Sequence, residues 1–130
     1  MSFERAREMI RTNERRTSVG EHSLPPTTNE ALQNAERIAR IVYELDPDLD
    51  SKDSLLSSLK VVHDESGILL SFNNEYGIFE FTCFDNGRFK FYQYMFIKNA
   101  QSYLLEENDI ELTDKEIKQR LKRKRYPYNK

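Results

Sequence analysis

The chain has 130 residues, of which 38% are hydrophobic and 32% are charged, and its formal net charge is −2. This length accommodates one domain with a modest core, and the absence of any run of 18 apolar residues excludes a membrane-spanning helix. The single cysteine, Cys83, excludes an internal disulfide, and the N-terminus lacks the apolar stretch of a secretory signal, so we expect a cytoplasmic protein.

Residues 1–26 are polar and lead into the sequence LPPTT. Within them, FERAREMI has the pattern of one or two helical turns with Phe3, Ala6, Met9 and Ile10 on one side, but so short a helix is marginal by itself. We therefore predict a flexible N-terminal arm that makes no contact with the rest of the protein. The alternative is an arm that becomes ordered on a protein partner, which Phe3, Met9 and Ile10 would contact.

The clearest helix is predicted over residues 28–46. Thr27 and Glu30 match a capping box, and Pro47 ends the pattern because the residue before a proline avoids the helical conformation. Six apolar residues recur at helical spacing, and we expect their stripe to pack on a sheet. They are Leu32, Ala35, Ile38, Ala39, Val42 and Leu45.

The acidic segment that follows matches part of a calcium-binding loop. Asp46, Asp48 and Asp50 occupy the first three ligand positions, but serines 51 and 57 stand where the loop requires a glycine and a glutamate. We therefore expect no metal site in this segment and no cofactor in the protein.

From Leu59 onward the apolar period changes to two. Four strand-like runs lie within residues 59–96, separated by the turn sequences DESG, NNEYG and DNG, and residues 103–112 add a short edge strand. The expected fold class is α+β, with an N-terminal helix packed on a four- to five-stranded antiparallel meander and a basic C-terminal helix after it. We expect a single domain over residues 27–125, between the arm and a tail at 126–130.

The hairpin FEFTCFDNGRFKFYQY, residues 79–94, has two possible registers. A two-residue loop mixes apolar and polar side chains on both faces, whereas a three-residue loop at 85–87 separates them, with Gly87 in the left-handed conformation. The second register predicts a core face of Phe79, Phe81, Cys83, Phe89 and Phe91. It predicts an outer face of Glu80, Thr82, Lys90, Tyr92 and Tyr94.

Tyrosines on the outer face of such a sheet have two interpretations. Tyr76, Tyr92 and Tyr94 would form a contact surface for another protein, or they would make ordinary cross-strand pairs. The sequence leaves both interpretations open.

The sequence contains no motif for catalysis. His22 lies in the arm, and His63 stands beside Asp64 and Glu65 at the end of a strand, where we expect it at the surface. A general base needs a positioned partner and a pocket, and neither histidine has an evident one. Cys83 is expected to point inward as a small core residue, so we expect a protein that is not an enzyme.

A C-terminal helix is predicted by a second capping box, Thr113 with Glu116, and by Ile117 and Leu121 on one face. Residues 115–130 carry a net charge of +7, whereas residues 17–114 carry −11.

The basic residues have three interpretations: a solvated helix end that attracts the acidic body, a contact with nucleic-acid phosphates, or a contact with an acidic protein. The side chains in question are Lys118, Lys122, Arg123, Lys124 and Arg125.

The order of LPPTTNEAL, VVHDESGILLSF, FEFTCFDNGRFKFY and IELTDKEIKQRL resembles a group of small bacterial proteins over residues 24–121. These share a Pro-Pro helix entry, a strand-turn-strand near a glycine, an aromatic hairpin and a terminal helix. They are uncharacterised proteins suspected of antitoxin-like or phage-defence roles. The resemblance implies such a role for this chain, but it carries over no functional residue.

Two functional hypotheses follow. The first is a non-catalytic protein-binding module, such as an antitoxin, an immunity protein or an accessory subunit in a bacterial or phage-conflict system. Its partner would be a toxin or effector protein, held by the arm and the outer face of the sheet. The alternative is a nucleic-acid-associated factor that uses the basic C-terminal helix, for which affinity should fall steeply with salt.

Overall fold

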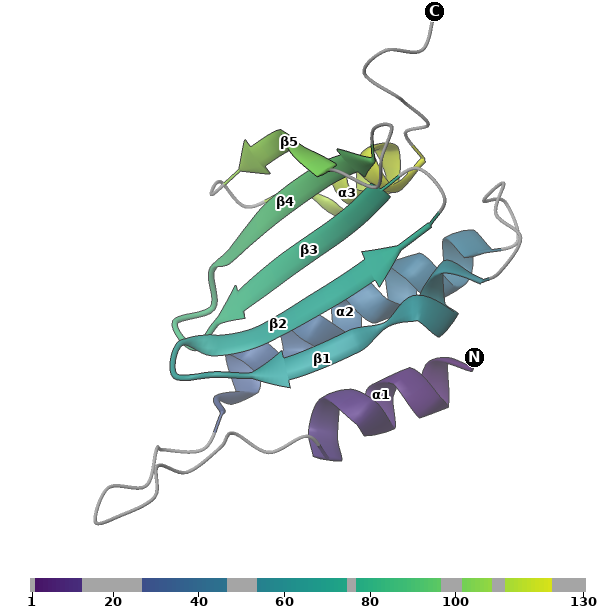
Figure 1. Cartoon of the computed structure of the whole chain (residues 1–130). Helices are drawn as coiled ribbons and strands as arrows, with labels where there is room; N and C mark the ends of the chain where they lie inside the picture. Colours follow the sequence, from purple (N-terminus) through teal and green to yellow (C-terminus); the bar gives the residue numbers. More distant parts are fainter. Residues whose placement is uncertain are drawn as a thin grey trace, which may run out of the picture.

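The structure is a computed structural model that describes residues 2–12, 27–46, 54–74, 77–96, 102–108 and 112–122. Its helices are α1 (Phe3–Thr12), α2 (Asn29–Leu45), the short 3-10 helix η2 (Leu55–Ser58) and α3 (Asp114–Leu121). Its strands are β1 (Lys60–His63), β2 (Gly67–Asn73), β3 (Gly77–Phe84), β4 (Phe89–Phe96) and β5 (Ser102–Asn108). Hydrogen bonds join the strands in the order β1-β2-β3-β4-β5, and every neighbouring pair is antiparallel (Figure 1). The predicted α+β class and its meander are confirmed.

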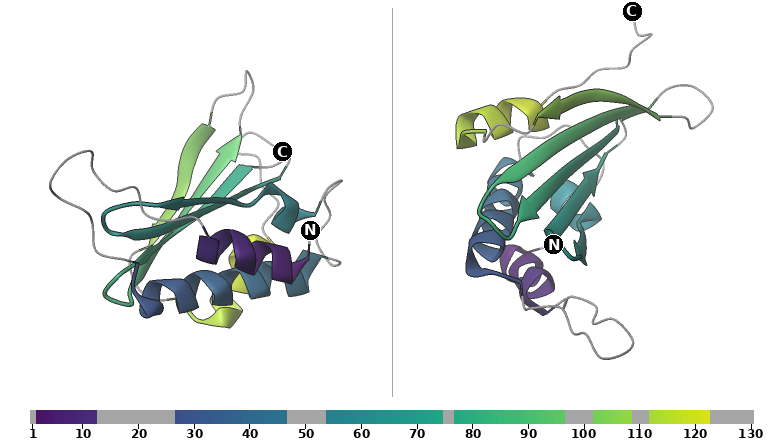
Figure 2. Two further views of the ribbon diagram at one scale, coloured as in Figure 1. Left: turned by 90° about the horizontal axis from the view of Figure 1, so that it is seen from below. Right: turned by 90° about the vertical axis from the view of Figure 1, so that its left-hand side faces the viewer.

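The described helices lie on one face of the sheet (Figure 2). The long helix α2 packs on β2 and β3, and α1 and α3 each pack on α2. Because strand residues alternate between the two faces, every second side chain of the central strands enters the layer between sheet and helices. The largest side chains buried there are phenylalanines: Phe72, Phe79, Phe81, Phe89 and Phe91.

The β3–β4 hairpin has the predicted register. Cys83 pairs with Phe89 and Phe81 pairs with Phe91, and Gly87 has a φ of +90°. The predicted core face is at most 2% exposed, whereas the predicted outer face is half-buried. The separation of apolar from polar side chains therefore selected the three-residue loop.

The start of α2 differs from its prediction by one residue. The N-cap is Thr28 and not Thr27, since Thr28 Oγ1 accepts a hydrogen bond from the Ala31 backbone N–H at 3.3 Å. Thr28 also donates from Oγ1 to the Asp85 backbone carbonyl at 2.9 Å, and its N–H donates to the Asp85 carboxylate at 3.0 Å. The β3–β4 hairpin thus fixes where α2 begins, through a tertiary contact that a local motif cannot indicate.

The apolar stripe of α2 is buried as predicted, except at one end. Ile38 and Val42 are inaccessible to solvent and Leu45 is 6% exposed, but Leu32 is only partly buried. Ile41, outside the predicted stripe, is also buried. A helix with neighbours on both sides buries a wider stripe than one that only faces a sheet, and α2 has α1 and α3 beside it.

The prediction of an N-terminal arm without contacts is wrong for residues 3–12. These residues form α1, which packs on α2 and completely buries Ala6 and Ile10. A ten-residue helix is marginal in isolation, so its packing on α2 supplies the stability that its own sequence lacks. The rest of the arm, 13–26, lies outside the described residues.

The prediction of a surface-exposed His63 is also wrong, because this side chain is only 9% exposed. Its Nε2 lies 2.9 Å from the Ile10 carbonyl oxygen in α1, and its Nδ1 lies 3.0 Å from Thr27 Oγ1. A carbonyl oxygen can only accept, so Nε2 carries the proton and donates to Ile10. A buried histidine needs partners on both nitrogens, and α1 and the segment before α2 supply them.

The helix α3 matches its prediction. The capping box is present, with the Thr113 N–H donating to Glu116 Oε1 at 3.0 Å and the Glu116 N–H donating to Thr113 Oγ1 at 3.2 Å. Ile117 and Leu121 are buried. The predicted tail at 126–130 lies outside the described residues.

Candidate interaction surface on the sheet

The face of the sheet opposite the helices is the candidate interaction surface, named here the outer sheet face. In the part of the chain that the structure describes, no helix or strand lies over it (Figures 1 and 2). Strand alternation decides which side chains this face presents. Its apolar and aromatic members are Val62, Leu69, Ile78, Phe84, Tyr92 and Tyr94.

The sheet register places these side chains next to one another. Val62 pairs with Leu69 across β1 and β2, and Ile78 pairs with Tyr94 across β3 and β4. The rings of Tyr92 and Tyr94 are stacked, with centroids 6.3 Å apart and planes 15° apart. Val62 is 51% exposed. The outer sheet face therefore presents aliphatic and aromatic surface from several strands.

Charged residues are interspersed on this face. Glu80 of β3 pairs with Ser71 on one side and Tyr92 on the other, and Lys90 of β4 pairs with Thr82. A third charged residue, Lys60 of β1, pairs with Ser71 on the same face. Aromatic residues are enriched at protein–protein interfaces, whereas charged residues are more typical of their rim than of their centre.

The structure does not bring the predicted contact residues together. Tyr92 and Tyr94 lie on the outer sheet face, half-exposed, whereas Phe3 and Met9 lie on α1 on the other side of the sheet, half-buried. Ile10 was predicted as a contact residue, but it is completely buried within the protein's own core and offers nothing to a partner in this conformation. Tyr76 lies outside the described residues.

Of the predicted basic residues, the structure describes two. Lys118 is half-buried on α3, and Lys122 is exposed at the C-terminal end of this helix. Residues 123–125, which carry the other three cations of that prediction, lie outside the described residues.

Three residues of the outer sheet face were not predicted from the sequence: Val62, Leu69 and Ile78. A signal for them existed, because the runs KVVH, GILLSF and GIFEF are apolar at successive positions. Such runs are expected when both faces of a strand are covered, and an uncovered strand with this pattern leaves apolar side chains exposed.

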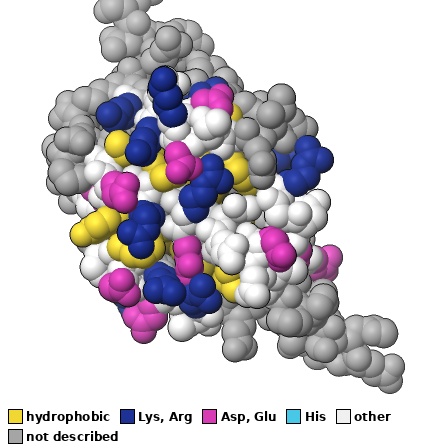
Figure 3. Space-filling view, turned by 180° about the vertical axis from the view of Figure 1, so that it is seen from behind, with side chains coloured by type: hydrophobic (Ala, Val, Ile, Leu, Met, Phe, Trp, Pro, Cys, Tyr) yellow, Lys and Arg dark blue, Asp and Glu magenta, His cyan; other side chains and the backbone are white. Residues whose placement is uncertain are grey.

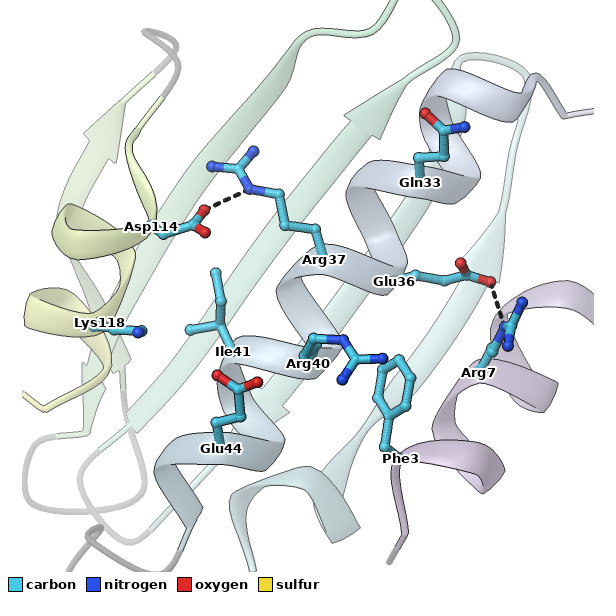
Figure 4. A pocket seen from close by; sticks show the side chains of 10 residues that line it. All are labelled: Phe3, Arg7, Gln33, Glu36, Arg37, Arg40, Ile41, Glu44, Asp114 and Lys118. Atoms are coloured by element: carbon cyan, nitrogen blue, oxygen red, sulfur yellow. Dashed lines mark hydrogen bonds and ion pairs between the residues drawn. The ribbon is translucent and has the colours of Figure 1, made fainter.

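The helical side of the molecule has a different character. Lysines and arginines alternate there with acidic residues (Figure 3). A hollow of about 530 Å³ lies along α2 between α1 and α3 (Figure 4). Arg37 donates to Asp114 at 2.6 Å and to the Leu112 carbonyl at 3.1 Å, which ties α2 to α3. On the α1 side of the hollow, Arg7 contacts Glu36 at 3.4 Å. The charges that line this hollow thus form surface contacts from α2 to α1 and from α2 to α3.

Cys83 has the properties of a core residue. Burial raises the pKa of its thiol to about 12, and the nearby Arg37 lowers it only in part. A thiol that remains protonated and has no solvent access is a poor nucleophile. Among the described residues, no group of three or more histidine, cysteine or acidic side chains is placed to hold a metal ion.

The described helices include none with the length and apolar character that crossing a membrane requires. Comparisons of the chain with protein-family models, with curated proteins and with solved structures found no match.

Proposed function

We propose that the protein is a non-catalytic protein-binding module that holds its partner on the outer sheet face. The observation that supports this proposal is the apolar surface formed by the exposed Val62 and the half-buried Leu69, Ile78 and stacked Tyr92–Tyr94 pair. Apolar surface that stays exposed on a folded protein favours an interaction site, and tyrosine is enriched among residues that dominate binding energy.

The scaffold also suits this role. Tyr92 and Tyr94 stand on a central strand with paired neighbours on both sides, so their backbone is already fixed before a partner arrives. Tyrosine has few rotatable bonds, and ordering it costs little conformational entropy. Binding to a rigid surface of this kind costs less conformational entropy than binding to a mobile loop.

In this proposal the partner is a toxin or effector protein, and the chain acts in the cytoplasm as an antitoxin, an immunity protein or an accessory subunit. The resemblance over residues 24–121 suggested this class of role, and the absence of a catalytic motif in the sequence is consistent with it.

The proposal can be tested by capture of partners from the native cell with the full chain as bait, followed by mass spectrometry. The double variant Val62→Asp/Tyr92→Ala should reduce capture of the specific partner by at least about tenfold, the effect of losing one dominant contact. The matched control is Gln119→Ala, which truncates an exposed side chain of α3, away from the outer sheet face. Thermal unfolding of both variants verifies that they are folded.

Two results would contradict the proposal. One is equal capture of the partner by the double variant and by the wild-type chain. The other is capture that disappears after nuclease treatment and weakens steeply as salt is raised, which indicates contact with nucleic-acid phosphates instead.

A further inference from the structure

The contact between α1 and α2 has the geometry of a separate amphipathic helix in a groove. Phe3 lies against Arg40 and Tyr43 in the second half of α2, whereas Arg7 and Arg11 reach Glu36, nearer its start. The two helices are therefore antiparallel, as Figure 1 also shows. The buried side chains of α1 are Ala6 and Ile10, which lie four residues apart and thus on one face.

Three polar side chains outside α1 contact this helix, each at a different point along its length. His63 Nε2 donates to the Ile10 carbonyl. This is one of the last four carbonyls of α1, for which the helix itself provides no N–H donor. Glu36 binds Arg11 through both carboxylate oxygens, one of them 3.2 Å from Nη2, and it also contacts Arg7. The guanidinium carbon of Arg40 lies 4.2 Å from the centre of the Phe3 ring.

These contacts hold α1 only weakly. The side chains of Arg7 and Arg11 are 49% and 45% exposed, and exposed ion pairs contribute little to stability because water and salt screen them. A ten-residue helix does not persist alone, and α1 contributes just Ala6 and Ile10 to the set of fully inaccessible residues. Opening of α1 should therefore require less free energy than global unfolding.

We propose that Glu36, Arg40, Tyr43 and His63 border a helix-binding groove, named here the α1 groove, in which a basic amphipathic helix of a partner protein replaces α1. The chemistry of the ligand follows from the groove. Glu36 selects arginines or lysines four residues apart, and Arg40 selects an aromatic ring one turn before them. His63 Nε2 donates a hydrogen bond to a carbonyl in the last turn of the helix. The α1 groove lies on the helical side of the molecule, so this site is separate from the outer sheet face.

The direct test uses a fluorescent peptide with the sequence of residues 2–12, SFERAREMIRT, and the full chain. Binding is followed by fluorescence anisotropy. In the full-chain variant Ile10→Gln, an amide without a partner enters the core, which weakens the docking of α1 but leaves the groove unchanged. Peptide affinity should then rise by about tenfold or more, because the apparent affinity follows the fraction of molecules whose groove is open. The same peptide with Ile10→Gln is the matched control and should bind more weakly.

A charge exchange tests the assigned ligand chemistry. The test uses the Ile10→Gln chain, in which α1 no longer competes for the groove. The double variant Ile10→Gln/Glu36→Arg should bind the native peptide at least about tenfold more weakly than Ile10→Gln alone, since like charges would face each other. A peptide with Arg7→Glu and Arg11→Glu should restore binding to this variant. Non-specific attraction of a basic peptide to an acidic chain gives no such restoration.

The variant Phe3→Ala provides a second test in case Ile10→Gln fails to fold. Phe3 is only half-buried, and its loss removes the contact with Arg40. It should also raise peptide affinity. Unchanged peptide affinity in both variants would overturn the proposal. So would native-state hydrogen exchange in which the amides of α1 exchange as slowly as those of β3, because α1 would then open only in global unfolding.

Discussion

At the scale of single residues, two glycines at positive φ have different physical requirements. A Cβ on Gly67 would lie 2.0 Å from the Cys83 carbonyl oxygen in the neighbouring strand, and its φ is +153°. Gly87 has a φ of +90°, but the nearest atom to its Cβ position is Glu30 Cβ at 3.7 Å. Gly67 is thus required because the backbone of β3 lies too close for a side chain. Gly87 is required only because the hairpin turn needs a positive φ.

Alanine substitutions should separate these two requirements. Gly87→Ala should lower the free energy of unfolding by about 1–2 kcal/mol, the cost of a left-handed residue with a side chain. Gly67→Ala should lower it by more than about 3 kcal/mol, because a backbone clash forces one strand to move. Urea unfolding of both variants measures the difference, and equal losses would show that the close approach at Gly67 is relieved without cost.

At the scale of the elements, α3 depends on its N-terminal capping box. Hydrogen bonds from the Thr113 backbone N–H and, to a lesser extent, the Thr113 side chain lower the pKa of Glu116. A carboxylate whose pKa is lowered in the folded state stabilises that state at pH values above its unfolded pKa. This contribution is lost as the pH falls through the folded pKa.

The variant Glu116→Gln should therefore be less stable than the wild-type chain at pH 7, and the difference should shrink as the medium becomes acidic. Thermal unfolding at pH 7 and pH 3 measures both. Glu65→Gln, the same change at an exposed turn residue, serves as the control for the substitution itself. If the stability difference between Glu116→Gln and the wild-type chain were the same at both pH values, the ionised Glu116 carboxylate would not contribute to the cap.

At the scale of the whole molecule, Cys83 reports on the cooperative core. It is completely inaccessible between the sheet and the helices, and its pKa of about 12 keeps the thiol protonated at neutral pH. The strands around it carry the largest buried side chains, so they should open only when the entire domain unfolds.

Labelling of Cys83 by a thiol reagent should accordingly occur at the rate set by global unfolding and rise in parallel with urea-induced unfolding. Labelling of Cys83 measures how often the whole domain unfolds. If α1 opens locally, its amide hydrogens should exchange at least about tenfold faster than global unfolding alone would allow. Rapid labelling of Cys83 in native buffer would instead show that the sheet and the helices separate locally.

The sequence by itself determined the elements whose signals are local. Alternation over residues 77–96 and the turn at 85–87 specified the register of β3 and β4, because a shift of one residue would exchange the buried and exposed faces. The capping box at Thr113 is likewise contained within four residues.

Only the tertiary structure decided the placement of α1, the burial of His63 and the choice of Thr28 as cap. Each depends on a partner distant in the sequence: α2 for α1, the Ile10 carbonyl for His63 and Asp85 for Thr28. The tertiary structure also determined the candidate site. Val62, Leu69 and Ile78 resemble core residues in the sequence. They stay partly or largely accessible because the described helices all pack on the opposite face of the sheet.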